Sequence, residues 1–287
     1  MVTGKSDLLR AQRRWADAHG VSYDARGCVR ALADNFRVPL DDSALAEFQR
    51  GSELTPRTTL PARAHSLCSS AALVINVFAY WRDRDQTPLL AALGMNGLAG
   101  TRLEFEVPLP TGLPGDPPTV DVALHRPDGR RVAIESKFGE WLTPRPRGKR
   151  VFKDKYFAQG QRVWEAAGLP RCQALADELQ GWHERPRYLN AAQLLKHALG
   201  LAVNGLRTST LVYLYYDRPG REAARHRAEL NLVAARLGDE IDLRVATYQS
   251  LFDALRVFPE LDGDYVEYLA RRYFASPARR AFAGGIA

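Results

Sequence analysis

The chain of 287 residues is long enough for one large domain or two small ones. Its 46% hydrophobic and 25% charged residues describe an ordinary globular protein that can bury a core. Lys and Arg number 40 against 33 Asp and Glu, and the resulting charge of +7 permits a polyanionic partner such as nucleic acid without requiring one.

The cysteines and the apolar segments exclude several classes of protein. Cys28, Cys68 and Cys172 are odd in number, widely spaced and in no CxxC pair, which argues against a disulfide scaffold or a zinc ribbon. The N-terminal sequence MVTGKSDLLRAQRRW lacks the apolar stretch of a secretory signal. The longest apolar run, within residues 67–81, is too short to span a bilayer. We therefore expect a cytoplasmic protein with no membrane association.

The first sixty residues carry helical patterns. Apolar positions among many charges predict a helix within residues 6–35, and residues 42–50 predict a short amphipathic helix. The sequence at 54–57, which contains a proline, breaks this pattern. We expect residues 1–60 to form an N-terminal helical extension.

A buried helix and three strands follow. Residues 69–81 are apolar on nearly all sides, which predicts a buried helix with Ser69 or Ser70 as its N-cap. Residues 103–109 alternate between apolar and acidic side chains, as in a half-buried strand. The sequences TVDVALH (119–125) and RVAIESKF (131–138) predict two strands joined by a tight turn.

Helices and strands alternate in the rest of the chain. The pattern predicts helices at 156–182 (with a break at 168–170), 190–203 and 221–237, strands at 208–216 and 241–248, and a helical tail. This order predicts an α/β fold with a mixed central β-sheet flanked by helices. We expect this core to cover residues 61–260 and the tail to cover residues 261–287.

The hairpin at 119–138 carries the most informative side chains. Glu135 and Lys137 lie on one face of the second strand, because side chains alternate between the two faces. The length of the turn decides whether Asp121, on the first strand, joins them. If it does, an acid on each strand and a lysine project from the same face of the sheet.

Two turn lengths are possible. A two-residue loop at 128–129 would place Asp121 opposite Ser136, whereas a three-residue loop at 127–129 would place it opposite Glu135. We predict the three-residue loop, because its proline suits the first turn position and its glycine the left-handed last position.

Two carboxylates this close repel each other unless something neutralises them. A divalent cation such as Mg²⁺ between Asp121 and Glu135, with Lys137 beside it, would do so, and it would also hold a phosphate oxygen and acidify a bound water. The alternative is an ordinary surface pair of Glu135 and Lys137 with a solvated Asp121. The spacing by itself leaves both interpretations open.

The segments TVD (119–121) and IESK (134–137) resemble the signature of the PD-(D/E)XK nuclease superfamily. Its leading proline is displaced here, since Pro118 lies three residues before the aspartate, a departure that the superfamily tolerates. Residues 67–78 look like the helix that opens a bacterial family of restriction-endonuclease-like proteins. In that family strands bearing Glu, Asp and Glu-Ser-Lys and a Gln-Leu-Leu-x-His helix follow, which resemble residues 104–106, 121, 135–137 and 193–197 here. The resemblance covers about residues 65–217.

This resemblance implies roles for individual residues. Asp121 and Glu135 would bind Mg²⁺, for which Mn²⁺ is expected to be able to substitute, and Lys137 would serve the nucleophilic water. Gln193 would approach the site from its helix, while His197 is expected to be a helix-face residue without a special role. A third acid would come from one of two glutamates on the preceding strand, Glu104 or Glu106, and we favour Glu106 because it lies nearer the strand middle.

A basic segment, RPRGKRVFKDK (145–155), follows the Glu-Ser-Lys strand. Six basic residues and one acid give this stretch +5 of the chain's net +7. The basic residues, expected to contact the DNA backbone, are Arg145, Arg147, Lys149, Arg150, Lys153 and Lys155. Arg185 and Arg187 could extend this patch; a solvated surface loop is the alternative.

The sequence thus favours a Mg²⁺-dependent nuclease, an endonuclease that hydrolyses phosphodiester bonds in DNA. A homodimer is one expectation, since cutting both strands often needs two copies. Two alternatives stay open. One is a catalytically inactive nuclease-fold module that binds nucleic acid; the other is an interaction protein whose polar sheet face docks a partner.

Overall fold

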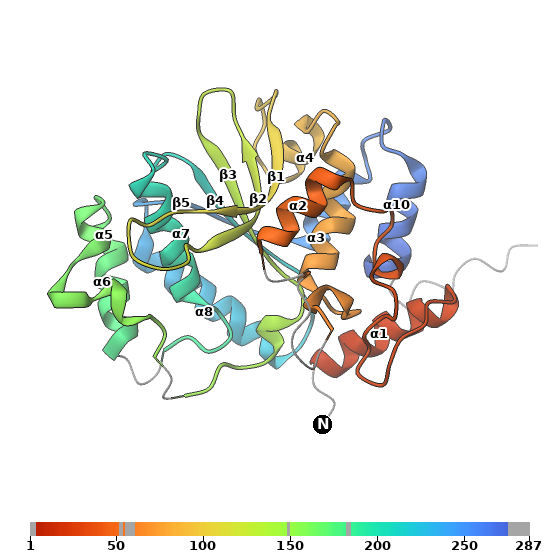
Figure 1. The fold of residues 1–287 in the computed structure, drawn as a ribbon, viewed down its shortest axis with the longest axis horizontal. Coiled ribbons are helices and arrows are strands. Elements are labelled where there is room, and N and C mark those ends of the chain that lie inside the picture. Colours follow the sequence, from red (N-terminus) through yellow and green to blue (C-terminus); the bar gives the residue numbers. More distant parts are fainter. Residues whose placement is uncertain (1–3, 52–53, 55–60, 148–149, 182–184, 275–287) are drawn as a thin grey trace, which may run out of the picture.

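The computed structural model describes residues 4–51, 54, 61–147, 150–181 and 185–274. Five strands form one mixed sheet in the order β1-β2-β3-β4-β5 (Figure 1). Their bounds are β1 Arg102–Pro108, β2 Thr119–His125, β3 Arg131–Lys137, β4 Thr210–Tyr215 and β5 Asp242–Thr247. The first three strands pair antiparallel, and β4 and β5 run parallel to β3. The predicted mixed central sheet flanked by helices is therefore confirmed.

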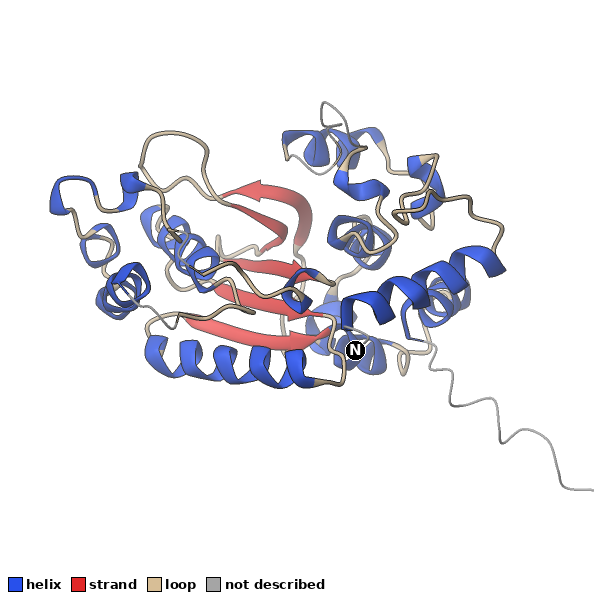
Figure 2. Ribbon diagram, turned by 90° about the horizontal axis from the view of Figure 1, so that it is seen from below, coloured by secondary structure: helices blue, strands red, loops and turns tan. Residues whose placement is uncertain are grey.

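The direction of each strand follows from what connects it to the next. A short turn joins β2 to β3 and returns the chain antiparallel. Helices α7 (Ala191–Val203) and α8 (Arg221–Leu237) lie between β3, β4 and β5 along the chain, and such crossovers keep successive strands parallel. Figure 2 shows α8 lying lengthwise along one side of the sheet.

The turn between β2 and β3 has the predicted three residues. The amide of Arg126 donates to the carbonyl of Arg130 at 2.9 Å, and Gly129 has a positive φ of 81°. Only glycine adopts this left-handed conformation without steric cost, which is why the sequence Pro-Asp-Gly selects this loop. The pairing of Val122 with Ile134 continues the same register along the strands.

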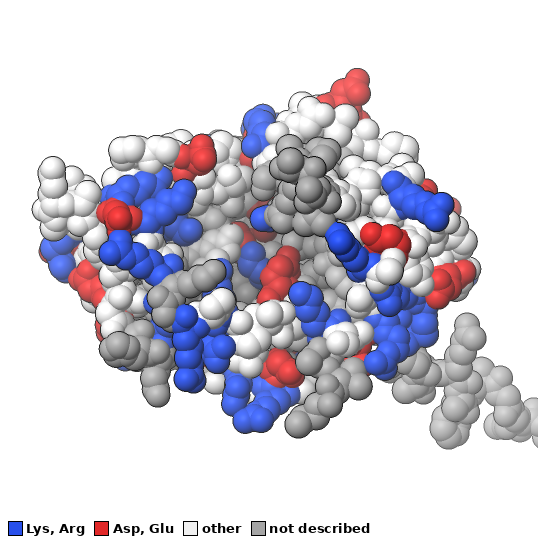
Figure 3. All heavy atoms as spheres, turned by 60° about the horizontal axis from the view of Figure 1, so that its bottom comes forward, with Lys and Arg blue, Asp and Glu red and all other residues white. Residues whose placement is uncertain are grey.

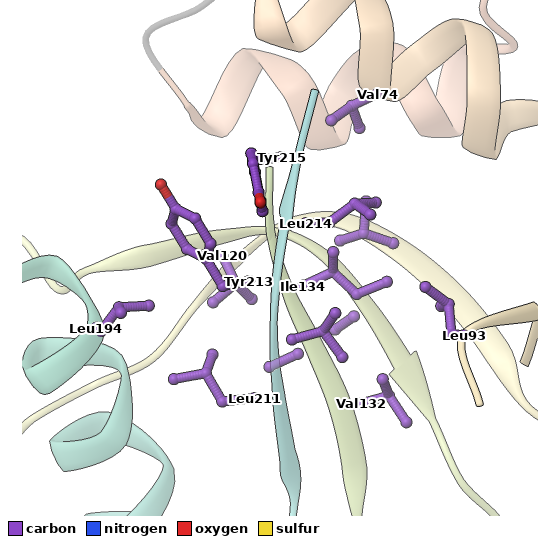
Figure 4. Packing of buried hydrophobic residues seen from close by; sticks show 14 of the residues in the cluster. Val74, Leu93, Val120, Val132, Ile134, Leu194, Leu211, Tyr213, Leu214 and Tyr215 are labelled. Atoms are coloured by element: carbon purple, nitrogen blue, oxygen red, sulfur yellow. The ribbon is translucent and has the colours of Figure 1, made fainter. Parts of the chain in front are cut away.

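Helices bury both faces of the sheet. Leu194 of α7 faces Leu211 and Tyr213 on one side, and Val74 lies toward Leu214 on the other (Figure 4). Val74 belongs to α3 (Ser70–Phe78), whose cap is Ser69, with its hydroxyl accepting from the amide of Ala72 at 3.1 Å. Burial on both faces explains why β4 is apolar along almost its whole length.

The remaining helices surround this core. They are α1 Gly4–Ala18, α2 Asp42–Arg50, α4 Thr87–Ala92, α5 Val163–Ala166, α6 Pro170–Gly181, α9 Tyr248–Leu255 and α10 Gly263–Leu269. Short 3₁₀ segments occupy Leu32–Asn35, Arg63–His65, Ala79–Trp81, Glu140–Leu142, Asp154–Tyr156 and Ala158–Gly160, and a π-helical turn occupies Ala270–Phe274. Among the described helices, none is long and apolar enough to cross a membrane.

The prediction of one helix within residues 6–35 is wrong beyond α1. The chain turns at Gly20, which has a φ of 67°, and Tyr23 then forms a β-bridge with Val29. Between them the Asp24 carboxylate accepts from the amide of Cys28 at 2.9 Å. An aspartate that bonds nearby amides offers the backbone an alternative to the helix, which the apolar spacing does not reveal.

The first fifty residues are bound tightly to the rest of the chain. Glu47 of α2 accepts from the amide of Phe105 in β1 at 2.9 Å, and Gln12 of α1 donates to the carbonyl of Arg272 at 3.0 Å. The division into an extension at 1–60, a core at 61–260 and a tail at 261–287 stays a prediction. Residues 1–3, 52–53, 55–60 and 275–287 lie outside the described part of the chain.

Candidate active site

Three carboxylates lie in one row across neighbouring strands. In β1 and β2, Phe105 pairs with Val122 and Val107 with Val120, so Glu106 lies opposite Asp121. In β2 and β3, Val122 pairs with Ile134, which places Asp121 opposite Glu135. The row Glu106, Asp121, Glu135 therefore runs perpendicular to the strands.

Glu106 occupies an unusual backbone conformation. It is buried, with 7% exposure, and has a φ of 48°, in the left-handed region that non-glycine residues rarely adopt. Its carboxylate also lies against Gly51, where a Cβ atom would come within 2.5 Å of Oε2. A strained residue persists only where its surroundings hold it, and such residues cluster at functional sites.

Glu104 lies elsewhere. Its register partner is Ala123 rather than Asp121, and its carboxylate contacts two arginines and a histidine ring. These are Arg50 at 3.0 Å, Arg102 at 3.1 Å and the ring of His125 at 3.0 Å. The structure thus brings Glu106, and not Glu104, to the row.

Glu135 and Lys137 do not form a surface pair, and that alternative is wrong. Glu135 is only 1% exposed, because α7 covers this face of the sheet. One carboxylate oxygen, Oε1, bonds the Lys137 ammonium, and the other, Oε2, is buried without a hydrogen-bond partner in the described part of the chain. The ring Nδ1 of His197 lies 3.5 Å from Oε2. His197 is thus buried beside the candidate site and is more than a residue on a helix face.

The charges of this cluster shift its pKa values. Burial, and then the neighbouring Glu135 carboxylate, raise the pKa of Asp121 well above its usual range. Burial works against the charged form of Lys137, but Glu135 and Asp121 outweigh it and raise the pKa of this ammonium. Burial lowers the pKa of His197 to about 4, so its ring is neutral near pH 7.

Two backbone and side-chain contacts fix the row. The amide of Ser136 donates to Oδ2 of Asp121 at 2.6 Å. On the other face of the sheet, the Ser136 hydroxyl and the Tyr248 hydroxyl are 2.7 Å apart. Asp121 is therefore held by the strand that carries Glu135 and Lys137.

Gln193 lies in the first turn of α7. Its side-chain oxygen accepts from Nδ2 of Asn190, the N-cap of the helix, at 2.9 Å. Among the described residues, no hydrogen bond joins it to Asp121, Glu135 or Lys137. It is one helical turn before His197, and its role stays a prediction.

Lys196 is a basic residue that sequence reasoning passed over. Burial and then the charge of Arg145 lower its pKa, and the Glu135 carboxylate opposes this shift. Lys196 therefore lies close enough to Arg145 and Glu135 for their charges to shift its pKa, and it connects the carboxylate row to the basic segment. In the sequence, the position of Lys196 directly before His197 was the only sign that it lies near the site.

No group of three or more Asp, Glu, His or Cys side chains in the described ranges is arranged to hold a metal ion as it stands. Two carboxylates suffice for Mg²⁺, which usually keeps several waters and takes one or two protein carboxylates. Asp121 and Glu135 fit this requirement, because they lie opposite each other and Oε2 of Glu135 is buried without a hydrogen-bond partner among the described residues.

The basic segment is partly engaged. Arg150 pairs with Asp154, and the Lys155 ammonium donates to the carbonyl of Pro114 at 2.6 Å. Lys153 is exposed. Lys149 lies outside the described residues.

Arg145 and Arg147 line a pocket of about 250 Å³ together with three further arginines. Its lining residues are Arg145, Pro146, Arg147, Arg150, Val151, Arg185, Pro186 and Arg187, and we call it the arginine pocket. The structure thus joins Arg185 and Arg187 to the basic segment. Lys and Arg side chains gather on the left of the face shown in Figure 3.

A mixed sheet with carboxylates and a lysine on adjacent strands places this chain among restriction-endonuclease-like α/β proteins. The chain matches, over residues 22–274, the family described as restriction endonuclease associating with ARP, and it belongs to that family. Membership suggests a nuclease. No curated protein and no solved structure matches the chain.

Proposed function

We propose that this protein is a Mg²⁺-dependent endonuclease of the PD-(D/E)XK type that hydrolyses phosphodiester bonds in DNA. The observation that carries the proposal is the row Glu106, Asp121 and Glu135 with the Lys137 ammonium against its end. The family match supports a nuclease, and the arginines beside the row suit a polyanionic substrate. Cutting both strands of a duplex often calls for two copies, and a homodimer is part of the proposal.

Asp121 and Glu135 would hold the metal, with Glu106 as a third acid. The bound ion would supply Lewis acidity toward a phosphate oxygen and a water of lowered pKa. The backbone of Ser136 keeps the Asp121 carboxylate aimed at this point through its 2.6 Å hydrogen bond.

Lys137 would act as a charged donor. Since Glu135 and Asp121 raise its pKa, its ammonium remains protonated at neutral pH. It would orient the attacking water or stabilise negative charge on the phosphorus-centred transition state. Substituting Arg for Lys137 would not replace it well, because a guanidinium is larger and planar.

Cleavage of plasmid and linear DNA with Mg²⁺ and with EDTA tests this function. Wild type should cut only with Mg²⁺, and Lys137→Ala and Asp121→Asn should lose roughly 100-fold or more of this activity. Arg14→Ala, which removes an exposed charge on α1, is the control and should retain activity. Equal cleavage by wild type and Lys137→Ala would contradict the assignment.

The alternative is an inactive module that keeps the fold and binds nucleic acid. It predicts salt-sensitive DNA binding that is the same for wild type and Asp121→Asn, without cleavage in Mg²⁺ or Mn²⁺. Oε2 of Glu135 argues for the enzyme. It is buried without a hydrogen-bond partner among the residues that the structure describes, which is costly unless it serves a ligand.

A further inference from the structure

The arginine pocket is formed by two segments that are far apart in the sequence. Residues 145–151 supply Arg145, Arg147 and Arg150, and residues 185–187 supply two more arginines. The other lining residues are Pro146, Val151 and Pro186, so no acidic side chain of the described part of the chain lines the pocket. Five guanidinium groups thus surround one hollow of about 250 Å³.

The walls of this pocket are fixed by backbone hydrogen bonds. The amide of Arg145 donates to the carbonyl of Arg187 at 2.8 Å, and Nε of Arg187 donates back to the carbonyl of Arg145 at 3.0 Å. The Glu229 carboxylate of α8 then accepts from the amides of Arg187, Tyr188 and Leu189 at 2.7–2.9 Å. The two arginine-bearing segments are therefore held together, rather than meeting by chance at a solvated surface.

Five like charges around one hollow repel one another. Arg150 pairs with Asp154, which does not line the pocket. An anion in the pocket would relieve the repulsion, and phosphate is the anion that a guanidinium fork binds best, through two parallel hydrogen bonds.

The size and shape of the pocket narrow the ligand further. A volume of about 250 Å³ lies just below the roughly 300–1,000 Å³ of ordinary small-molecule sites. It suits a single phosphate group with an attached sugar, whereas the continuous backbone of a strand needs an open groove. The two prolines and the valine offer an apolar wall to such a sugar or its base.

We propose that the arginine pocket binds a phosphate monoester, the terminal phosphate of a DNA strand, so that the enzyme acts on DNA with a phosphorylated end near the cleavage point. This inference rests on the proposed function and names its substrate class. A terminal phosphate carries one more negative charge than a phosphodiester, which matches the density of arginines. The charges of Arg145 and Glu135 both shift the pKa of Lys196, so this residue connects the pocket to the carboxylate row.

The test measures binding in EDTA, where cleavage plays no part. Short labelled single strands with a 5′-phosphate, a 3′-phosphate or only hydroxyl ends are titrated and followed by fluorescence anisotropy. Wild type should bind one phosphorylated strand about tenfold more tightly than the hydroxyl strand, the effect of one charge-assisted hydrogen bond pair. This preference should vanish in Arg147→Ala, whose side chain is exposed, and persist in the charge-matched control Arg14→Ala.

Arg145→Ala provides a second variant, because the hydrogen bonds between Arg145 and Arg187 use the backbone of Arg145 and survive the substitution. Equal binding of phosphorylated and hydroxyl strands by wild type would overturn the proposal. If free deoxyadenosine monophosphate competes as well as a phosphorylated strand does, the assignment to a strand end is overturned and the ligand is a free nucleotide.

Mg²⁺-dependent cleavage at a rate independent of end phosphates would refute this inference and leave the proposed nuclease intact. A lack of cleavage together with end-dependent binding would do the reverse.

Discussion

The ion pair between Glu47 of α2 and Arg82 offers a sharp test of how the N-terminal helices support the site. The guanidinium donates to both oxygens of Glu47 at 2.7 Å, and one of these oxygens also accepts from the amide of Phe105 at 2.9 Å. Phe105 directly precedes Glu106, the strained member of the carboxylate row. Glu47 therefore fixes the segment of β1 that aims Glu106.

Glu47→Ala should destabilise the protein strongly. The side chains of Arg82 and Glu47 are only 13% and 9% exposed. The variant would leave the buried amide of Phe105 without its acceptor, and the Arg82 guanidinium would keep Ser43 and, at 3.6 Å, Asp41. Removing one member of such a pair costs about 3–5 kcal/mol. Arg50→Ala is the matched control, since it breaks a second contact between α2 and β1, the ion pair of Arg50 with Glu104. These two side chains are 50% and 20% exposed, respectively. That loss should cost less than about 1 kcal/mol.

Urea unfolding of both variants measures these costs. Burial alone would raise the pKa of Glu47, but Arg82 and the amide of Phe105 lower it, so its stabilising effect is full above the unfolded pKa of about 4. The difference between wild type and Glu47→Ala should therefore shrink as the pH falls below about 4. The reasoning fails if Glu47→Ala unfolds within 1 kcal/mol of wild type, or if Arg50→Ala costs as much.

Three further predictions concern the site and its surroundings. His226 is buried with Nε2 3.0 Å from the Tyr213 hydroxyl, and burial lowers its pKa to about 4. Its contribution to stability is full above the unfolded pKa of about 6.5 and falls as the pH drops toward 4. Between these pH values, the free energy of unfolding measured in urea should fall by about 3 kcal/mol less for His226→Phe than for wild type. Gly51→Ala should push the Glu106 carboxylate aside and lower Mg²⁺-dependent cleavage by about 10- to 100-fold; unchanged cleavage would exclude Glu106 from the metal site. Lys196→Met should weaken DNA binding in EDTA by a few-fold with a smaller salt dependence; an unchanged salt slope would show that Lys196 does not contact phosphate.

The sequence alone determined the features that depend on neighbouring residues. Alternation of apolar and polar side chains located the strands at 119–125 and 131–138, which the structure has as Thr119–His125 and Arg131–Lys137. Turn chemistry selected the loop at 127–129, and that loop alone sets the register that brings Asp121 opposite Glu135. An amide in the apolar helix α3 must be hydrogen-bonded, and Nδ2 of Asn76 donates to the carbonyl of Asn35 at 3.0 Å and to the Tyr273 hydroxyl at 2.9 Å.

Only the tertiary structure decided what surrounds these residues. Residues 19–31 are not helical because the Asp24 carboxylate accepts from the amide of Cys28, a local contact that apolar spacing does not encode. The burial of Glu135, the approach of His197 and the left-handed conformation of Glu106 depend on α7 and α2, which lie far from the strands in sequence. The arginine pocket is the clearest case. Residues 145–151 and 185–187 lie far apart in the sequence, and Glu229 of α8 binds the second of these segments. Periodicity and turns act over a few residues, whereas charge, strain and cavities arise from which distant segments the core brings into contact.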